Sequence, residues 1–477
     1  MNTIKSILSR YRPRYIRAIV YMMQASEYRV RDYLHWSYRV RDFSSVEHRK
    51  RLLMTPKAKV LYVTAWVAVI AVLLLIALDI SSSPAFPHIA ATALIVAFPF
   101  LLPYLMLIPL IVINLAQIPV EKVVIARAKR ALEKHKGLRI AIAGSFGKTT
   151  MREILKTVLG EGRRVAAPPG SYNTPLGIST FINGLAGDEE ILIFELGEYY
   201  PGDVRKLCGF VEPHMGIMTG VNEAHLEKFK TLEKTANTIF ELAEWLKEKP
   251  VFVNAESKLA RERALPAHIL YNREGVEDWR VINPVTSLNG TSFTLARKGA
   301  KVEIKSRLLG LHNIGPLLAV VDIASRLGLT DEQIRSGVAK TEPFEHRLKP
   351  RVDESGVVTI DDSYNGNPDG VRAAIAFLGS VKGQRRFYVT PGLVEMGERK
   401  REVHKEIGRQ LARAKIEKVV LIKNSVTPYI EEGLLGSGYK GEIIWFDDAL
   451  MAYAALPQMT VKGDIVLLQN DWPDQYA

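Results

Sequence analysis

The sequence predicts an α/β protein with two sheet-based domains, preceded by a basic arm and by transmembrane helices. Three observations predict this class: positive charge is concentrated near the N-terminus, two long stretches carry no charge, and short apolar runs alternate with amphipathic segments from about residue 137 onward. Of the 477 residues, 47% are hydrophobic and 24% are charged, which excludes a wholly disordered chain. The single cysteine, Cys208, excludes a disulfide scaffold and a cysteine-rich metal site, and we expect it to be a packing residue.

Residues 1–59 are predicted to form a basic arm. They hold fourteen Lys and Arg and four acidic residues, and therefore carry +10 of the formal net charge of +13. The pattern Tyr-Arg-Val-Arg-Asp at residues 28–32 recurs at residues 38–42. Basic residues interleaved with aromatic ones suit a helix lying on anionic lipid headgroups, and they also suit nucleic acid. Because apolar stretches follow directly, we expect lipid headgroups as the partner and no nucleic acid.

Residues 60–120 are predicted to form a membrane anchor. Residues 60–78 carry no charge and come close to the ~20 residues that a spanning helix needs. A second charge-free stretch, residues 90–120, places another span at about residues 90–118. Its four prolines favour either one kinked helix or a short re-entrant pair. Two buried helices of a soluble protein are the alternative.

The flanks of this anchor predict its orientation. Lys and Arg are frequent on both outer sides of residues 60–120, and the loop at residues 79–89 has neither. The positive-inside rule then puts both the arm and the long C-terminal part in the cytoplasm. We expect a multi-pass protein of the inner or plasma membrane with cytoplasmic catalytic domains. The polar arm ahead of the first apolar stretch argues against a cleavable signal peptide.

A phosphate-binding loop is predicted at residues 144–150. The apolar run 138–143 is typical of a buried strand, the segment Gly-Ser-Phe-Gly-Lys-Thr-Thr follows, and residues 151–159 show a helical pattern. Backbone N–H groups of such a loop converge on phosphate oxygens at a helix N-terminus. We expect Lys148 to reach the β- and γ-phosphates and Thr149 to offer its hydroxyl to Mg²⁺. The nucleotide-binding residues expected here are Gly144, Ser145, Gly147, Lys148, Thr149 and Thr150.

Two further strands end in groups that could hold a metal. Residues 191–197 are typical of a buried strand ending at Glu195, a carboxylate placed to bind Mg²⁺ directly or through water. Residues 216–222 predict another strand, and His225 after it could be a second metal ligand. An incidental carboxylate and a surface histidine are the alternatives for each residue taken alone.

A nucleotide-binding turn is predicted in the C-terminal part. The β-branched run 357–360 is typical of a strand, and residues 361–368 bring acids, an aromatic ring and amides directly after it. This composition suits contacts to ribose and base. Upstream, Arg347 lies in an expected linker, where it could bind a transferring phosphate or be a solvated charge.

Taken together, residues 137 to the end resemble the Mur ligase family, the ATP-dependent amide-bond ligases of peptidoglycan and related pathways. The likeness is greatest to the members that add D-alanyl-D-alanine to a muramyl tripeptide. The segments that carry it are residues 144–150, 173–177, 195–197, 222 with 225–227, 312–313, 346–348, 361–368, and 395–398 with His404. The resemblance implies a central ATP-binding P-loop domain at 137–343 and a smaller Rossmann-like C-terminal domain at 344–477. Within them we expect a β-rich segment at 281–309 and C-terminal strands at 386–389, 418–423, 443–446 and 464–468.

The resemblance also implies a mechanism and a site. ATP phosphorylates a substrate carboxylate, an amine attacks the acyl phosphate, and phosphate leaves as the amide forms. By this likeness Lys148, Glu195, His225 and Arg347 are the catalytic residues, with Mg²⁺ held by Thr149, Glu195 and His225. Arg347 with Asp361 or Asp362 would clamp the nucleotide, while Asn313, Tyr364 and Asn365 would line adenine and ribose, and Asn173 and Thr174 would lie near the acyl acceptor.

Three departures from the family pattern shape the expected function. The carbamylated lysine of the family falls at Ile239, with Asn237 two residues earlier, and an expected adenine-contacting Asn is Pro316. The arm and anchor stand where the family keeps its UDP-sugar domain. We therefore expect a membrane-anchored amide ligase that joins an amino acid or peptide to a carboxylate acceptor on an envelope precursor. A membrane location favours a precursor that is itself lipid-linked. A poly-γ-glutamate-synthase-like ligase and a catalytically degenerate nucleotide-binding scaffold are the alternatives.

Overall fold

The computed structural model describes residues 7–40, 42–47, 51–82, 89–170, 172–223, 226–297, 300–364 and 366–470. The chain divides into two compact units. The first is helical and lies within residues 1–123, and the second, residues 124–471, contains both sheets. Each unit is described by itself.

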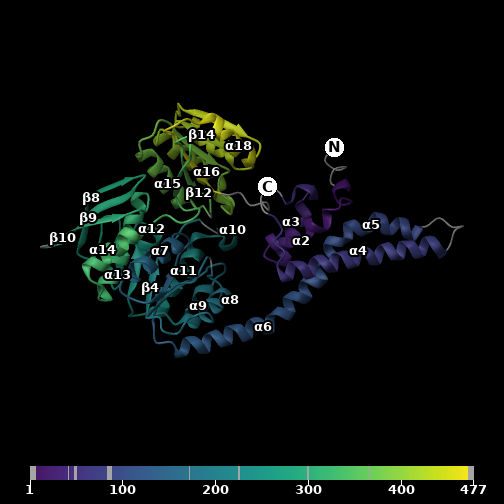
Figure 1. The fold of residues 1–477 in the computed structure, drawn as a ribbon, viewed down its shortest axis with the longest axis horizontal. Helices are drawn as coiled ribbons and strands as arrows, with labels where there is room; N and C mark the ends of the chain where they lie inside the picture. The colour runs from purple at the N-terminus through teal and green to yellow at the C-terminus, as the bar shows by residue number, and fades with distance from the viewer. Residues whose placement is uncertain are drawn as a thin grey trace. The chain divides into compact units, whose positions relative to one another are not determined.

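The first unit is built on two long apolar helices, α4 and α5, which lie side by side (Figure 1). Two helical stretches, Pro56–Ser81 and Ala91–Lys134, are long and apolar enough to cross a membrane. The predicted second span is therefore helical throughout, with Met106 marking the junction of α5 and α6, and the helix continues beyond residue 118. The helices are α2 (Tyr15–Ala25), α3 (Val30–Arg39), α4 (Pro56–Ser82), α5 (Ile89–Leu105) and α6 (Leu107–Lys134), with a short 3₁₀ turn η1 (Phe43–Ser45).

Tyrosines of the arm satisfy backbone carbonyls that the prolines of α5 release. A proline inside a helix has no N–H to donate, so the carbonyl four residues earlier loses its partner. Pro99 and Pro103 thus release the carbonyls of Ile95 and Pro99. The Tyr11 hydroxyl donates to the Ile95 carbonyl at 3.2 Å, and the Tyr15 hydroxyl donates to the Pro99 carbonyl at 2.6 Å. These bonds explain how α5 tolerates two internal prolines.

The arm is consequently a packed helical layer, which differs from the expected helix lying on lipid headgroups. Tyr15, Tyr33 and Trp36 are buried, in one apolar cluster with residues of α4, α5 and α6 such as Leu61 and Leu102. The hydroxyl of Tyr33 also donates to the carbonyl of Pro103 at 3.0 Å. These three aromatic residues therefore have a structural role in holding the apolar helices, whereas Tyr38 of the repeated pattern is exposed.

The second unit begins with a ten-stranded sheet in the order β10-β9-β8-β7-β6-β5-β4-β1-β3-β2. Strands β1 to β6 pair in parallel, and β7 to β10 add an antiparallel extension, which confirms the β-rich segment expected at 281–309. The strands are β1 (Leu138–Ala143), β2 (Val165–Ala166), β3 (Ile191–Glu195), β4 (Met215–Met218), β5 (Val251–Asn254), β6 (Ile269–Asn272), β7 (Gly275–Val276), β8 (Trp279–Ser287), β9 (Gly290–Arg297) and β10 (Ala300–Ser306).

Helices cover both faces of this sheet, as alternation along β1 requires. Ile140 and Ile142 belong to one apolar cluster, whereas Ala141 and Ala143 belong to the cluster on the other face. Leu132 of α6 is buried in the second cluster, so the end of α6 is part of this domain's core. The helices are α7 (Lys148–Leu159), α8 (Pro175–Ile182), α9 (Asp203–Val211), α10 (Leu226–Phe229), α11 (Leu232–Leu246), α12 (Lys258–Arg263), α13 (Ile314–Arg326) and α14 (Asp331–Lys340), with a 3₁₀ turn η2 (Leu311–Asn313).

The C-terminal domain has a six-stranded sheet in the order β11-β12-β16-β13-β14-β15, parallel except for β11. The strands expected at 386–389, 418–423, 443–446 and 464–468 are confirmed to within a residue at each end. The elements are β11 (Lys349–Val352), β12 (Val358–Asp362), β13 (Arg386–Thr390), β14 (Lys418–Ile422), β15 (Glu442–Phe446), β16 (Ile465–Gln469), α15 (Pro368–Ser380), η3 (Gly397–Arg399), α16 (Lys400–Arg413), α17 (Thr427–Leu435) and α18 (Ala449–Met459).

Candidate functional site

The predicted phosphate loop has the strand–loop–helix geometry that it needs. β1 ends at Ala143, the loop follows, and α7 begins at Lys148. Gly144 and Gly147 both have positive φ angles, of 150° and 74°. A Cβ atom at Gly144 would lie 2.1 Å from the Thr219 hydroxyl oxygen, so only glycine allows the loop to approach β4 this closely. The loop is thus a compact backbone cradle at the N-terminus of a twelve-residue helix.

Lys148 is folded back onto this cradle. Its ammonium donates to the Gly144 carbonyl and to both carboxylate oxygens of Glu198, at 2.8 and 2.9 Å. The Glu198 side chain is only 1% exposed. Sequence reasoning missed Glu198, although a second acid three residues after Glu195 at the end of a buried strand was a visible signal.

Glu195 closes the base of the site at the end of β3, where it is 2% exposed. The Thr149 hydroxyl donates to its Oε2 at 3.3 Å, and the Arg152 guanidinium lies 2.7 Å from its Oε1. Burial raises the pKa of Glu195, and the nearby charges of Arg152 and Lys148 oppose that rise. Arg152, 4% exposed, is a second residue that sequence reasoning missed, and its signal was its place on α7 one turn beyond the loop.

The donor set fits a divalent cation. Although Arg152 is close to Glu195 Oε1, the pair lacks hydrogen-bond alignment, and this buried oxygen finds no hydrogen-bond partner among the described residues. Carboxylate and hydroxyl oxygens are the ligands that Mg²⁺ prefers. Thr149 and Glu195 would hold the ion here, as the sequence predicts. His225, the third expected ligand, lies outside the described residues.

The loop after β4 joins the phosphate loop to the C-terminal domain. The backbone N–H of Asn222 donates to the Ser145 hydroxyl at 3.4 Å. Its side-chain amide donates to Asn367 at 2.8 Å and to Asp369 at 3.0 Å. Asn367 also caps α15, because its side chain accepts from the N–H of Gly370. The start of α15 is therefore tied directly to the loop that follows β4.

The predicted C-terminal clamp is brought together around Arg347. The guanidinium carbon of Arg347 lies 5.5 Å from the centre of the Tyr364 ring. Asp362 is buried, and its carboxylate accepts from the Gln469 amide at 2.6 Å and from the Leu348 N–H at 3.3 Å. Burial raises the pKa of Asp362, and Arg347 opposes that rise. Asp362 thus has a structural role in the domain core.

Asp361 faces the linker. Its carboxylate is 2.8 Å from His346 Nδ1 and accepts from the Ser363 hydroxyl at 2.6 Å. Of the two acids in this turn, Asp361 is the more exposed and is the better candidate for a nucleotide contact. Asn365, also expected to contact the nucleotide, lies outside the described residues.

The remaining predicted residues lie at element termini. The Asn173 carbonyl accepts from the Gly197 N–H at 2.9 Å, two residues beyond Glu195, and the Thr174 hydroxyl caps α8. These bonds place Asn173 and Thr174, the residues expected near the acyl acceptor, beside the end of β3. Asn313 is buried at the start of α13, and its amide donates to the backbone carbonyl of Leu309, four residues earlier, at 2.8 Å.

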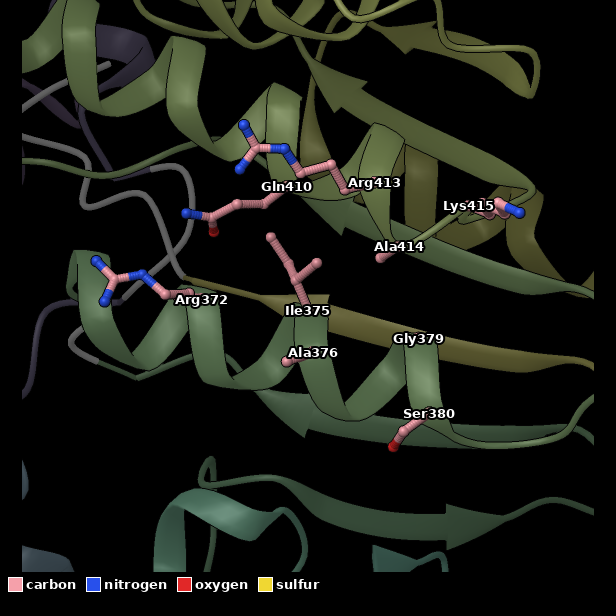
Figure 2. Close-up of a pocket in the computed structure, with 9 residues that line it drawn as sticks. All are labelled: Arg372, Ile375, Ala376, Gly379, Ser380, Gln410, Arg413, Ala414 and Lys415. Carbon is pink, nitrogen blue, oxygen red and sulfur yellow. The ribbon is translucent and has the colours of Figure 1, made fainter. Parts of the chain in front are cut away.

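A shallow groove runs between α15 and α16, and none of the site residues named above lines it. It is lined by Arg372, Ile375, Ala376, Gly379, Ser380, Gln410, Arg413, Ala414 and Lys415 (Figure 2). Two of its three basic side chains are already paired, Arg372 with Asp369 at 2.9 Å and Arg413 with Glu406 at 3.6 Å. This groove therefore presents little unpaired charge, and we assign it no role.

Comparisons with known proteins agree with this arrangement. Residues 142–324 match the family model of the Mur ligase middle domain, and residues 346–469 match the model described as "Mur ligase, glutamate ligase domain". The UDP-N-acetylmuramoyl-tripeptide–D-alanyl-D-alanine ligase of Bacillus subtilis is 25% identical over 69% of this chain and 72% of its own length. That of Treponema pallidum is 31% identical over 56% of this chain and 57% of its own length, less than two thirds of that relative.

Solved structures show the same fold. MurF ligase from Thermotoga maritima in complex with ADP superposes with a TM-score of 0.64 at 25% identity, covering 74% of this chain and 81% of that one. MurF from Acinetobacter baumannii gives a TM-score of 0.65 at 22% identity, covering 75% and 78%.

The matched domains include the glycine cradle and the polar residues around it. Mur ligases are ATP-dependent, ADP-forming enzymes that use Mg²⁺, and the glycine cradle, Lys148, Thr149 and Glu195 fit those requirements. Through its middle and C-terminal domains, this chain belongs to the Mur ligase family.

Proposed function

We propose that this protein is a membrane-anchored, ATP-dependent amide ligase that acts on a peptidoglycan-type envelope precursor. The observation that carries the proposal is the constellation of Lys148, Thr149 and buried Glu195 at the glycine cradle. The relatives named above join D-alanyl-D-alanine to a UDP-linked muramyl tripeptide, so a dipeptide amine and a muramyl-peptide carboxylate are the first substrates to test.

The proposed chemistry asks mainly for positioning and charge neutralisation. The substrate carboxylate takes the γ-phosphoryl group of ATP and ADP leaves. The amine then attacks the acyl carbon, loses a proton, and displaces phosphate. Lys148 would neutralise charge on the β- and γ-phosphates, and Arg347 would bind the transferring group from the linker. Bound Mg²⁺ would supply further neutralisation of the phosphate oxygens.

We further propose that the acceptor is lipid-linked and that α4 to α6 anchor the enzyme beside it. Apolar side chains are exposed along these helices, including Leu73, Leu74, Val112 and Leu115. Exposed apolar surface of this length is costly in water and favourable in a bilayer. Basic flanks on both sides favour a hairpin with the arm and the ligase domains in the cytoplasm. An enzyme held at that surface would meet precursors confined to the same surface.

The decisive experiment is ADP release by the full chain reconstituted in lipid vesicles, with D-alanyl-D-alanine and either a lipid-linked or a UDP-linked muramyl peptide. We expect faster release with the lipid-linked acceptor. Equal or faster release with the UDP-linked acceptor would refute the lipid-linked substrate, and no release with either would refute the ligase assignment for these substrates.

Lys148→Ala is the matched variant for the nucleotide site. We expect it to lower ADP release by at least about 100-fold, because it removes the charge nearest the transferred phosphate. Lys206→Ala is the control, since this lysine is 75% exposed on α9 and should leave turnover unchanged. A Lys148→Ala variant with normal turnover would exclude this loop as the ATP site.

A second function, a nucleotide-binding scaffold without turnover, is favoured by one observation. Ile239 is fully buried in the apolar cluster beneath α11, so the position expected for the family's carbamylated lysine offers no carboxylate. ADP and Mg²⁺ binding without ADP release under any of the above conditions would support the scaffold over the ligase.

A further inference from the structure

We propose that Glu198 is a metal-binding residue of the nucleotide site, and that it exchanges Lys148 for a divalent cation when nucleotide binds. This inference rests on the proposed nucleotide site and adds to it a ligand that the sequence motifs did not include. Glu198 lies just beyond β3, three residues after Glu195, and is 1% exposed.

All three N–H groups of Lys148 are engaged in this structure. An ammonium group has three hydrogens to donate. In this structure the three contacts of Lys148 are the Gly144 carbonyl and the two oxygens of Glu198. A phosphate can therefore receive a hydrogen bond from Lys148 only if at least one of these contacts is released.

The buried site balances two carboxylates with two cationic side chains. Glu195 is paired with Arg152, and Glu198 is paired with Lys148. All four side chains are at least 88% buried. When Lys148 turns to a phosphate, Glu198 becomes a buried carboxylate that faces additional negative charge. Such a group is strongly unfavourable unless a new cation replaces the ammonium.

A divalent cation that arrives with the nucleotide is the best replacement for the ammonium group of Lys148. Arg152 is not free to take the place of the ammonium beside Glu198, because it is already paired with Glu195 and donates to the Gly170 carbonyl. A Mg²⁺ ion that arrives with the nucleotide carries the needed charge and prefers carboxylate oxygens. Thr149 and Glu195 already offer oxygens in the same site. Glu198, three residues beyond the end of β3, would then be a further protein ligand of the cation.

The test is Mn²⁺ binding to the full chain in detergent micelles, followed by electron paramagnetic resonance with and without ADP. We compare wild type with E198Q and with the control E190Q, a partly exposed acid at the opposite end of β3. We expect E198Q to weaken Mn²⁺ binding in the ADP complex at least tenfold. ADP binding without metal should stay the same or become tighter, because a negative charge has been removed. E190Q should match the wild type in both measurements.

An E198Q variant that binds Mn²⁺ with ADP like the wild type would overturn the proposal and reduce Glu198 to a partner of Lys148. If E198Q fails to fold, E198D keeps the charge and shortens the side chain by one methylene. We expect E198D to weaken Mn²⁺ binding at least threefold, and unchanged binding would overturn the proposal. Failure of wild-type protein to bind ADP would instead refute the proposed nucleotide site itself.

Discussion

The side chain of His404 is buried and has a structural role. The ring is fully buried under the turn after β13, where Nε2 accepts from the N–H of Leu393 at 2.9 Å and Nδ1 donates to the Lys400 carbonyl at 2.5 Å. Burial lowers the pKa of His404 from 6.5 to about 4. The neutral ring is therefore one of the fixed contacts between this turn and α16.

This pKa predicts how stability depends on pH. Between pH 6.5 and about 4 the unfolded chain binds a proton at His404 that the folded chain does not, so stability is complete above pH 6.5 and falls as the pH approaches 4. The shift corresponds to roughly 3 kcal/mol. We expect the melting temperature of His404→Gln to be lower than that of wild type at pH 7.5 and to fall less between pH 6.5 and 4. His35, which is exposed, provides the control at neutral pH: His35→Gln should melt like wild type at pH 7.5.

At the same scale, sequence spacing reveals some features of the candidate site and not others. Lys148, Thr149 and Glu195 were predictable because loop and strand periodicity fix where such residues lie. Glu198 and Arg152 had only a positional signal, because their importance comes from burial and from their ion pairs with Lys148 and Glu195. Asp362 was assigned to the nucleotide, but its hydrogen bond to Gln469 of β16 depends on strand order.

At the scale of elements, regular strands and helices were predictable, and the partners of the arm were not. Short apolar runs predicted the C-terminal strands to within a residue at each end. Nothing in the arm's own pattern shows that its tyrosines meet the proline-containing helix α5, since those contacts join residues about 70 to 85 positions apart. Basic and aromatic composition alone therefore favoured a surface role for aromatic residues that the structure buries.

The packing of the arm on α5 predicts a specific effect of removing one hydroxyl. Tyr33→Phe removes the bond to the Pro103 carbonyl, and Tyr15→Phe removes the bond to the carbonyl that Pro103 releases at Pro99. Each loss should cost about 1 kcal/mol and raise the open population of the arm roughly fivefold. Limited proteolysis within residues 1–59, in detergent micelles, measures that population. Tyr38→Phe is the control because Tyr38 is 87% exposed, and equal cleavage of all three variants would contradict the structural role of the two hydroxyls.

At the scale of the whole molecule, the chain combines a helical unit with a ligase unit that begins at Val124. The sequence placed that boundary at about residue 137, but Ala128 and Leu132 of α6 are buried in the core of the middle domain. A boundary inside a continuous helix has no composition signal, because the helical pattern continues through it. A truncation that is meant to keep the ligase unit intact should therefore begin at residue 124.

That truncation tests whether the helical unit contributes to turnover of a membrane-bound acceptor. The protein from residue 124 onward retains the glycine cradle, Lys148 and Glu195, so we expect it to bind ADP as the full chain does. With a lipid-linked acceptor in vesicles, we expect the full chain to release ADP at least tenfold faster, because confinement to one surface raises the effective concentration of both reactants. With a soluble acceptor, the two proteins should be equal. The measurement is ADP release by both proteins with both acceptors. Equal rates with the lipid-linked acceptor would show that the helical unit does not help the enzyme to meet its substrate. Loss of ADP binding in the truncated protein would show that the two units depend on each other for folding.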